Sequence, residues 1–142
     1  MSIENKTLVQ RWFSEVWNEG RADAIDEMLA DDAVVHGLGA DLHGSAEFKH
    51  FHSAYRNAYP DVTIHIDGLV AEGDLVAVRW SASGTHRGDG LVLPATGRRA
   101  QFTGMSRSRI SSARYEQAGQ LMAEVLAIGD VRDDQQHQAH HE

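Results

Sequence analysis

The sequence predicts one α+β domain in which a curved antiparallel sheet wraps around helices that come first in the chain. Apolar residues recur at helical spacing before Pro60, and from Val62 onward they alternate with polar residues, as strands require. The 142 residues, 42% of them hydrophobic, suffice for one domain with a core but not for two ordinary ones. Such a sheet cannot close fully over its helices, so this architecture predicts an apolar cavity for a small molecule.

Three helices are expected before the sheet. Residues 5–19 form the first, which ends at Asn18-Glu19-Gly20, and residues 22–29 repeat the same period. The third begins with Ser45 as its N-cap and ends before Pro60. Its apolar side carries Phe48, Phe51, His52 and Tyr55.

Five strands are expected, joined mostly by short turns and loops. The expected strands are 33–36, 62–66, 69–71, 75–88 and 98–110. Glu72-Gly73-Asp74 is a turn signal, so the strands on either side of it are predicted to form an antiparallel hairpin. Residues 37–44 and 88–97 are expected to be loops, because glycine, proline and aspartate gather there.

The strand over residues 75–88 carries polar groups where a buried strand should carry none. Arg79 lies in an apolar run, and His86 ends the strand between two glycines. An arginine and a histidine that face a concavity can bind or act on a small molecule, so this strand is predicted to form a pocket wall. Two structural alternatives stay open: His86 could bond loop backbone, and Arg79 could pair with a helix carboxylate.

Composition excludes several function classes. The formal charge of −8, from 13 basic and 21 acidic residues, gives no field that attracts nucleic-acid phosphates. The chain has no cysteine, which excludes disulfides, thiolate zinc sites and a cysteine nucleophile. No apolar run approaches the roughly 20 residues of a membrane helix, and the first residues lack a signal-peptide pattern. A cytoplasmic protein that contacts neither nucleic acid nor membrane is therefore expected.

The chain offers no sequence signature of a metal or cofactor site. His137, His140 and His141 lie in a polar tail over residues 131–142, which is expected to be disordered. The folded domain is expected over residues 1–130, and it contains no His-Glu-x-x-His pattern and no Gly-rich phosphate loop. We therefore expect no metal and no cofactor.

Several motifs, taken in their order, resemble a known family. They are Val9-Gln10-Arg11-Trp12-Phe13, Trp17-Asn18-Glu19-Gly20, Asp31-Asp32-Ala33-Val34-Val35-His36-Gly37, Tyr59-Pro60-Asp61-Val62, Gly84-Thr85-His86-Arg87-Gly88 and Pro94-Ala95-Thr96-Gly97-Arg98-Arg99. Over roughly residues 5–110 the chain resembles SnoaL-like polyketide cyclases of the NTF2-like superfamily. The resemblance implies a cone-shaped barrel with a hydrophobic cavity and a homodimer formed through the sheet.

The resemblance also implies an active site, with one member absent. In the cyclases an aspartate and a histidine promote an intramolecular aldol closure, and His86 resembles that histidine. The register of the aspartate falls on Ser106, and Ser81 stands where the related epoxide hydrolases have an acid near the position of Arg79. Whether Asp41, Asp67 or Asp89 replaces the missing base stays open.

The C-terminal part departs from the family pattern. Relatives have a final strand there, whereas residues 112–129 place apolar side chains at helical spacing between a capping serine and Gly129. An extra C-terminal helix is therefore expected, with the closing strand lost or replaced. The apolar stripe is formed by Tyr115, Ala118, Leu121, Met122, Val125 and Leu126.

Two functions from different classes follow from these expectations. The first is a lyase or isomerase for a small, fairly apolar carbonyl compound, in which His86 moves a proton and Arg79 stabilises oxyanion charge. The second is a non-catalytic ligand-binding or dimeric scaffold domain, since the carboxylate positions are empty. In either case the residues expected to line the cavity are Trp12, His36, Phe51, Tyr55 and Met105.

Overall fold

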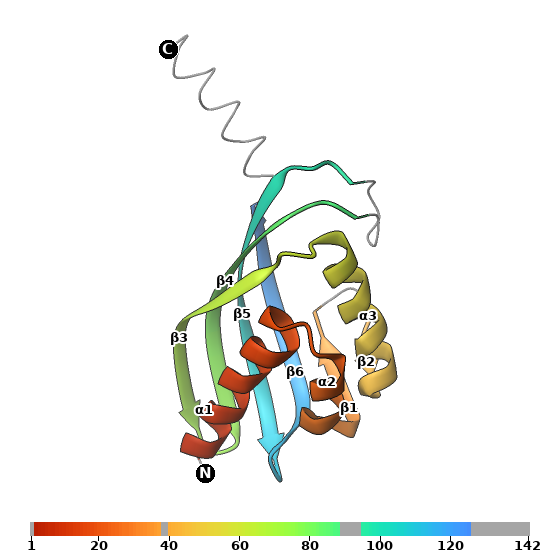
Figure 1. Cartoon of the computed structure of the whole chain (residues 1–142). Coiled ribbons are helices and arrows are strands. Elements are labelled where there is room, and N and C mark those ends of the chain that lie inside the picture. Colours follow the sequence, from red (N-terminus) through yellow and green to blue (C-terminus); the bar gives the residue numbers. More distant parts are fainter. Residues whose placement is uncertain (1, 38–39, 89–94, 126–142) are drawn as a thin grey trace.

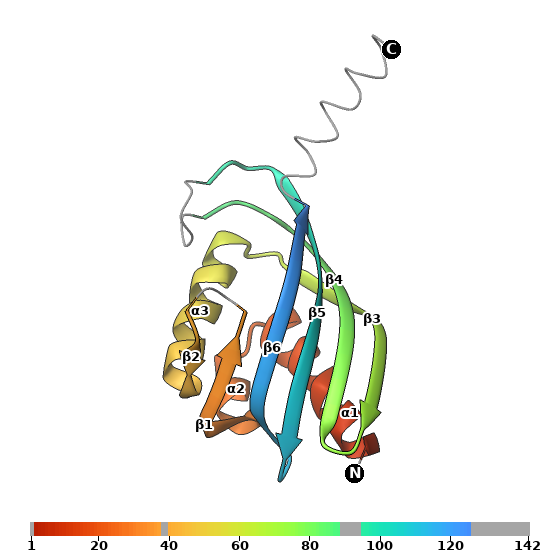
Figure 2. The same ribbon diagram turned by 180° about the vertical axis from the view of Figure 1, so that it is seen from behind.

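The protein is described from a computed structural model that covers residues 2–37, 40–88 and 95–125 (Figure 1). In this part of the chain, four helices lie on one face of a curved six-stranded sheet, which is seen from behind in Figure 2. The helices are α1 (Ser2–Arg11), the π-helix η1 (Trp12–Asn18), α2 (Ala22–Met28) and α3 (Gly44–Ala58). The strands are β1 (Leu29–His36), β2 (Leu42–His43), β3 (Thr63–Glu72), β4 (Leu75–Thr85), β5 (Arg99–Ser111) and β6 (Arg114–Val125).

The α+β fold is the predicted one, but the sheet is mixed rather than antiparallel. Its strand order is β2-β1-β6-β5-β4-β3, and all neighbours are antiparallel except β1 and β6, which run parallel. The chain can make this parallel pair because four strands and α3 separate β1 from β6. The sheet is curved and does not close into a barrel, which agrees with the cone-shaped fold that the resemblance implies.

The core lies between the helices and the inner face of the sheet. Strand β5 buries every second residue, from Ala100 to Ile110, so its inner and outer faces are clearly separated. Strand β4 does the same, with Val76, Val78 and Trp80 on the inner face. The first predicted helix supplies the opposing side chains, chiefly Leu8, Val9, Trp12, Phe13 and Val16.

Strand β3 is longer than the sequence pattern indicates. The segments predicted as two strands, 62–66 and 69–71, form one strand that pairs with β4 throughout, as the predicted hairpin requires. The register shifts between Ile66 and Gly68, so Asp67 lies in a β-bulge. The bulge interrupts the alternation, which made one strand look like two.

The N-terminus of α3 differs from the prediction that Ser45 caps it. The residue before the helix is His43, in extended conformation, and no side chain caps the first turn. Instead, the His43 backbone N–H donates to Glu47 Oε1 at 2.7 Å. Gly44 allows this entry because its φ of 76° lies in the left-handed region.

The predicted C-terminal helix is wrong, because residues 114–125 form strand β6. Ser112 and Ala113, with φ of 53° and 59°, make a tight turn after β5, and β6 then pairs with β5 from Arg114 to Val125. A register shift at Glu116 places Tyr115 and Ala118 on the same buried face, three residues apart. The bulge thus explains why Tyr115 and Ala118 show a three-residue spacing that resembles a helix. The closing strand is therefore present.

No helix within the described residues is long and apolar enough to cross a membrane. The predicted tail over 131–142, including His137, His140 and His141, lies outside the described residues.

Candidate functional site

His86 lies just beyond the end of β4 and is buried, with 7% of its surface exposed. Its backbone N–H donates to the Arg98 carbonyl at 2.9 Å, and its own carbonyl accepts from the Gly97 N–H at 2.7 Å. These two bonds continue the pairing of β4 with β5 by one step. The imidazole is therefore held on a rigid strand end rather than on a free loop.

The two ring nitrogens of His86 have different surroundings. Nδ1 lies 3.2 Å from the hydroxyl of Thr96. Nε2 is fully buried and has no hydrogen-bond partner among the residues that the structure describes. Buried polar atoms are nearly always paired, so an unpartnered imidazole nitrogen is the feature expected of a group that meets a ligand.

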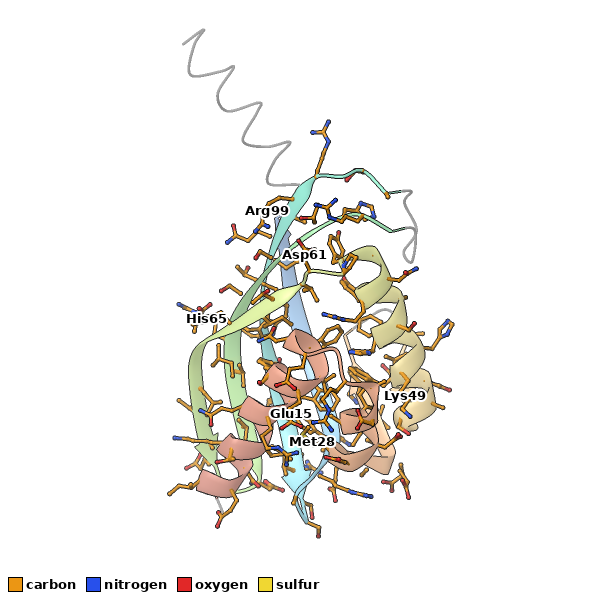
Figure 3. All side chains as sticks on the ribbon, viewed as in Figure 1. Glu15, Met28, Lys49, Asp61, His65 and Arg99 are labelled. Carbon is orange, nitrogen blue, oxygen red and sulfur yellow. The ribbon has the colours of Figure 1, made fainter. Side chains whose placement is uncertain are left out.

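The strand end that carries His86 is fastened to the C-terminal end of α3. Asp61 accepts hydrogen bonds from both the backbone N–H and the hydroxyl of Thr85, at 2.7 and 2.8 Å. Burial would raise the pKa of Asp61, but these bonds outweigh burial and lower the pKa overall. The backbone N–H groups of Arg87 and Gly88 donate to the Ala58 carbonyl. Asp61, labelled in Figure 3, thus holds Thr85 at the end of β4, next to His86.

An aromatic wall joins His86 to the interior of the fold. Tyr59 stacks on His86 with ring centroids 5.3 Å apart and an interplanar angle of 29°. Phe102 meets the Tyr59 ring edge-on at 5.2 Å, and Tyr55 stacks beside Tyr59 at 6.1 Å. Phe51 continues the row at 5.0 Å from Tyr55. The predicted residues Phe51 and Tyr55 therefore belong to the same aromatic surface as His86.

Among the described residues, the space between Trp12 and the sheet is almost filled. A cavity of about 10 Å³ lies between Trp12 and the sheet, close to the space of a single water, so it cannot hold a larger ligand. The Trp80 ring covers Gly104, where an added Cβ would collide with it, and Trp80 Nε1–H donates to Ser106 Oγ at 3.2 Å. Ser106, at the register where the resemblance implies an acid, thus accepts a hydrogen bond from a core tryptophan.

Arg79 does not lie beside His86. The alternation of β4 puts Arg79 on the outer face of the sheet, where it is exposed, whereas Trp80 faces the helices. The sequence predicts Arg79 and His86 on one pocket wall, whereas the structure places Arg79 on the side of the strand that is turned away from the helices. Ser81 donates instead to Asp67 across the bulge of β3.

Two other predicted cavity residues also lie on the outer side. Met105 is 52% exposed on the outer face of β5. His36 ends β1, half exposed, with Nδ1 3.1 Å from Asp41 Oδ1. Both border a shallow concavity of about 470 Å³ that runs over β4, β5 and β6, so neither lines the interior.

No carboxylate among the described residues bonds His86. Asp41 pairs with His36, and Asp67 accepts from Ser81. Asp89, the third candidate for the missing base, lies outside the described residues. The structure thus separates the two remaining candidates from His86.

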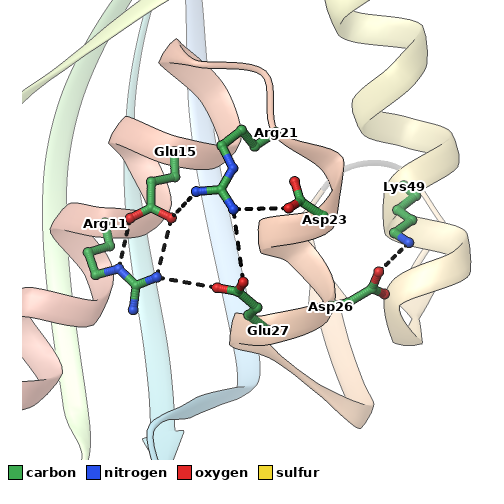
Figure 4. A network of polar contacts seen from close by, with 7 residues as sticks. All are labelled: Arg11, Glu15, Arg21, Asp23, Asp26, Glu27 and Lys49. Carbon is green, nitrogen blue, oxygen red and sulfur yellow. Dashed lines mark hydrogen bonds and ion pairs between the residues drawn. The ribbon is translucent and has the colours of Figure 1, made fainter.

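The charged network on the helices is distant from this site. In Figure 4, Arg11 and Arg21 bridge Glu15 and Glu27 between η1 and α2, and the hydrogen bond from Arg11 lowers the pKa of Glu15. Since Arg11, Arg21 and Glu27 are more than a third exposed, these ion pairs contribute little to stability. His52, on α3, is buried and donates to the Val16 carbonyl; burial lowers its pKa and keeps it neutral.

The sequence pattern gave no role to Tyr59 and Thr96, which contact His86, or to Asp61, which holds the preceding Thr85. Each lay within a motif that carried the family resemblance, so their order along the chain was a signal. Their function depends on contacts between α3, β4 and the start of β5, which local patterns do not report.

Comparison with known proteins now places the chain in a family. The model of SnoaL-like polyketide cyclases matches residues 7–122. The chain belongs to the SnoaL-like polyketide cyclase family. The match extends across most of β6, in agreement with a closing strand rather than a helix.

Solved structures share the SnoaL-like fold. A candidate polyketide cyclase from Acidithiobacillus ferrooxidans is 27% identical, with a TM-score of 0.75 over 94% of this chain and 99% of that one. IdmH, a candidate polyketide cyclase from Streptomyces antibioticus, is 26% identical, with a TM-score of 0.75 over 89% and 97%. A SnoaL-like candidate cyclase from Jannaschia sp. CCS1 has a TM-score of 0.79 at 18% identity, over 85% and 86%. No curated protein matches the chain.

Proposed function

We propose that this SnoaL-like protein is a cofactor-independent lyase or isomerase that acts on a small, largely apolar carbonyl compound beside His86. The observation that carries the proposal is the buried Nε2 of His86, which has no partner in the described structure. A histidine can move a proton near neutral pH, and a desolvated position strengthens its hydrogen bond to a reacting oxygen. The family match supports chemistry of the aldol type.

The aromatic wall supports an apolar substrate. Tyr59 stacks on the imidazole, and Phe102, Tyr55 and Phe51 continue this row of rings. Aromatic surfaces bind the carbon skeleton of a ring compound by burial. The substrate lies at the end of β4 in this proposal, because the interior cavity is too small for it. Arg79 takes no part, since it is on the outer face.

Enolisation of a ketone tests the proposal without knowledge of the natural substrate. With 1-acetylnaphthalene in D2O, we expect the protein to accelerate exchange of the methyl hydrogens, followed by NMR. His86→Ala should reduce the catalysed exchange about a hundredfold or more, because general acid or base catalysis contributes roughly 10²–10⁴. His65→Ala is the matched control, since the side chain of His65 is 81% exposed on β3. Exchange at the wild-type rate in His86→Ala would contradict the proposal.

A non-catalytic binding domain is the second candidate. It is favoured by the absence of a carboxylate bonded to His86 among the described residues, since acid and base catalysis usually needs a matched pair. If 1-acetylnaphthalene binds beside His86 and its hydrogens exchange no faster than in buffer, this candidate replaces the first.

We also propose that the protein forms a homodimer through the outer face of its sheet. Val70 and Met105 are large apolar side chains exposed there, 67% and 52%, and Met105 borders the concavity of about 470 Å³. Exposed apolar groups gathered on one face are typical of an interface.

Met105→Asp should therefore convert a dimer into a monomer in analytical ultracentrifugation, because burial of an unpaired carboxylate is costly. Ile3→Asp is the control, since Ile3 is even more exposed, at 78%, but lies on α1 away from the sheet's outer face. A wild-type monomer, or a Met105→Asp dimer of unchanged affinity, would overturn the interface.

A further inference from the structure

We infer that Thr96 is a positioning residue that holds His86 in the tautomer with its proton on Nε2. His86 then meets the ligand as a hydrogen-bond donor to a carbonyl or enolate oxygen, rather than as the base. The inference rests on the proposed function for its catalytic meaning, but the tautomer itself can be tested without any substrate.

The hydroxyl of Thr96 sits between two groups. Its oxygen accepts a hydrogen bond from the Arg98 backbone N–H at 3.3 Å, and the same oxygen lies 3.2 Å from His86 Nδ1. A hydroxyl carries one hydrogen and two lone pairs. Since the Arg98 N–H occupies a lone pair, the Thr96 hydrogen can be donated to Nδ1.

This direction gives a continuous chain of hydrogen bonds. The Arg98 N–H donates to the Thr96 oxygen, and the Thr96 O–H donates to Nδ1; each bond polarises the next and strengthens it. In the opposite direction the Thr96 oxygen would accept hydrogen bonds from both Arg98 N–H and His86 Nδ1–H. The Thr96 hydrogen would then take no part in this series of hydrogen bonds. The cooperative direction makes Nδ1 an acceptor, so the single proton of the neutral ring is on Nε2.

The neighbours of His86 hold its backbone and one face of its ring. Its backbone N–H and carbonyl bond to Arg98 and Gly97 on the adjacent segment, and Tyr59 stacks on one ring face. A buried N–H without an acceptor is rare in folded proteins, and a ligand oxygen supplies what it lacks. The ligand oxygen therefore approaches in the plane of the imidazole, beside the aromatic wall.

This role fits the absence of an acid at Ser106. A neutral histidine that donates from Nε2 stabilises the negative charge that develops on a carbonyl oxygen during enolisation, while a water or buffer base from the solvent takes the proton from carbon. In this scheme His86 needs no carboxylate partner. His86 is the catalytic residue, and Thr96 acts only through it.

The tautomer can be measured by long-range ¹H–¹⁵N NMR of the histidine side chains in the intact chain. The spectrum of His86→Gln identifies the His86 signals by their loss. At a pH where histidine side chains are neutral, we expect Nε2 to show the ¹⁵N chemical shift of a protonated nitrogen. Nδ1 should show the chemical shift of an unprotonated nitrogen. Thr96→Ser should preserve this pattern and Thr96→Val should lose it. A protonated Nδ1 in the wild type, or an unchanged pattern in Thr96→Val, would overturn the inference.

Binding of two matched probes tests what the Nε2–H recognises. 1-Acetylnaphthalene and 1-ethylnaphthalene share a skeleton, but only the ketone accepts a hydrogen bond. The ketone should bind roughly tenfold more tightly, as one hydrogen bond in a buried site allows, and the preference should disappear in His86→Ala and weaken in Thr96→Val. Equal binding of both probes would contradict a donor at Nε2. If neither probe binds while NMR shows the Nε2–H tautomer, the proposed function fails and the positioning by Thr96 stands.

Discussion

Trp80→Ala should lower the free energy of unfolding by about 3–5 kcal/mol, the range for removal of a large aromatic side chain from a core. Trp80 is 6% exposed and covers Gly104 so closely that no side chain fits there. The substitution empties the space of the indole and leaves Ser106 Oγ without its donor. In a domain of this size the midpoint of thermal unfolding should fall by roughly 10–20 °C, measured by circular dichroism together with urea denaturation.

Trp80→Phe separates packing from the hydrogen bond. It keeps an aromatic ring over Gly104 but removes Nε1–H, so the loss should be smaller, about 1–2 kcal/mol. Because Trp80→Ala opens a cavity next to the small one at Trp12, added indole should restore part of the lost stability. A Trp80→Ala protein within about 1 kcal/mol of wild type would show that the ring does not fill the interior, and a natural ligand cavity there would have to be reconsidered.

The alternation of β4 illustrates what the sequence could and could not predict. Two-residue spacing places Arg79 opposite Trp80 in any strand, so the separation of the two side chains was predictable. Which face meets the helices was not, because Leu75 and Ala77 make the Arg79 side apolar as well. Only the packing of α1 and η1 against Val76, Val78 and Trp80 decides the question.

The candidate site, like the orientation of β4, was predictable only in part. The motif Gly84-Thr85-His86 indicated a functional histidine, and the structure shows that His86 is buried with one nitrogen unpartnered. The stacking of Tyr59 and the hydroxyl of Thr96 reach His86 from 27 positions before it and 10 after it (86 − 59 and 96 − 86). Such contacts arise from tertiary packing, and no local pattern encodes them.

The C-terminal strand shows how one bulge can mislead a periodicity argument. Tyr115 and Ala118 are buried three residues apart, a spacing that a regular strand cannot produce on one face and a helix produces naturally. The register shift at Glu116 reconciles that spacing with a strand. The unpaired edges of β1 and β5 then favour strand over helix, because β6 satisfies the backbone groups of both.

Removal of β6 should abolish folding. A chain that ends at Ala113 lacks the strand between β1 and β5, which splits the sheet, and it lacks the Tyr115 ring that packs 4.8 Å from Trp12. The stability of a domain is only about 5–15 kcal/mol, less than the loss of a central strand with two hydrogen-bonded neighbours. We expect no cooperative thermal transition and no near-ultraviolet circular dichroism signal.

A chain that ends at Val125 is the matched control, because it retains every residue of β6 and all the pairings described for it. Its thermal midpoint should stay within a few degrees of that of the full chain, since a shift of roughly 1 kcal/mol corresponds to only about 3–4 °C at this size. If residues 114–125 were a helix that caps the sheet from outside, the chain ending at Ala113 would still unfold cooperatively. Cooperative unfolding of that shorter chain would therefore contradict the central position of β6.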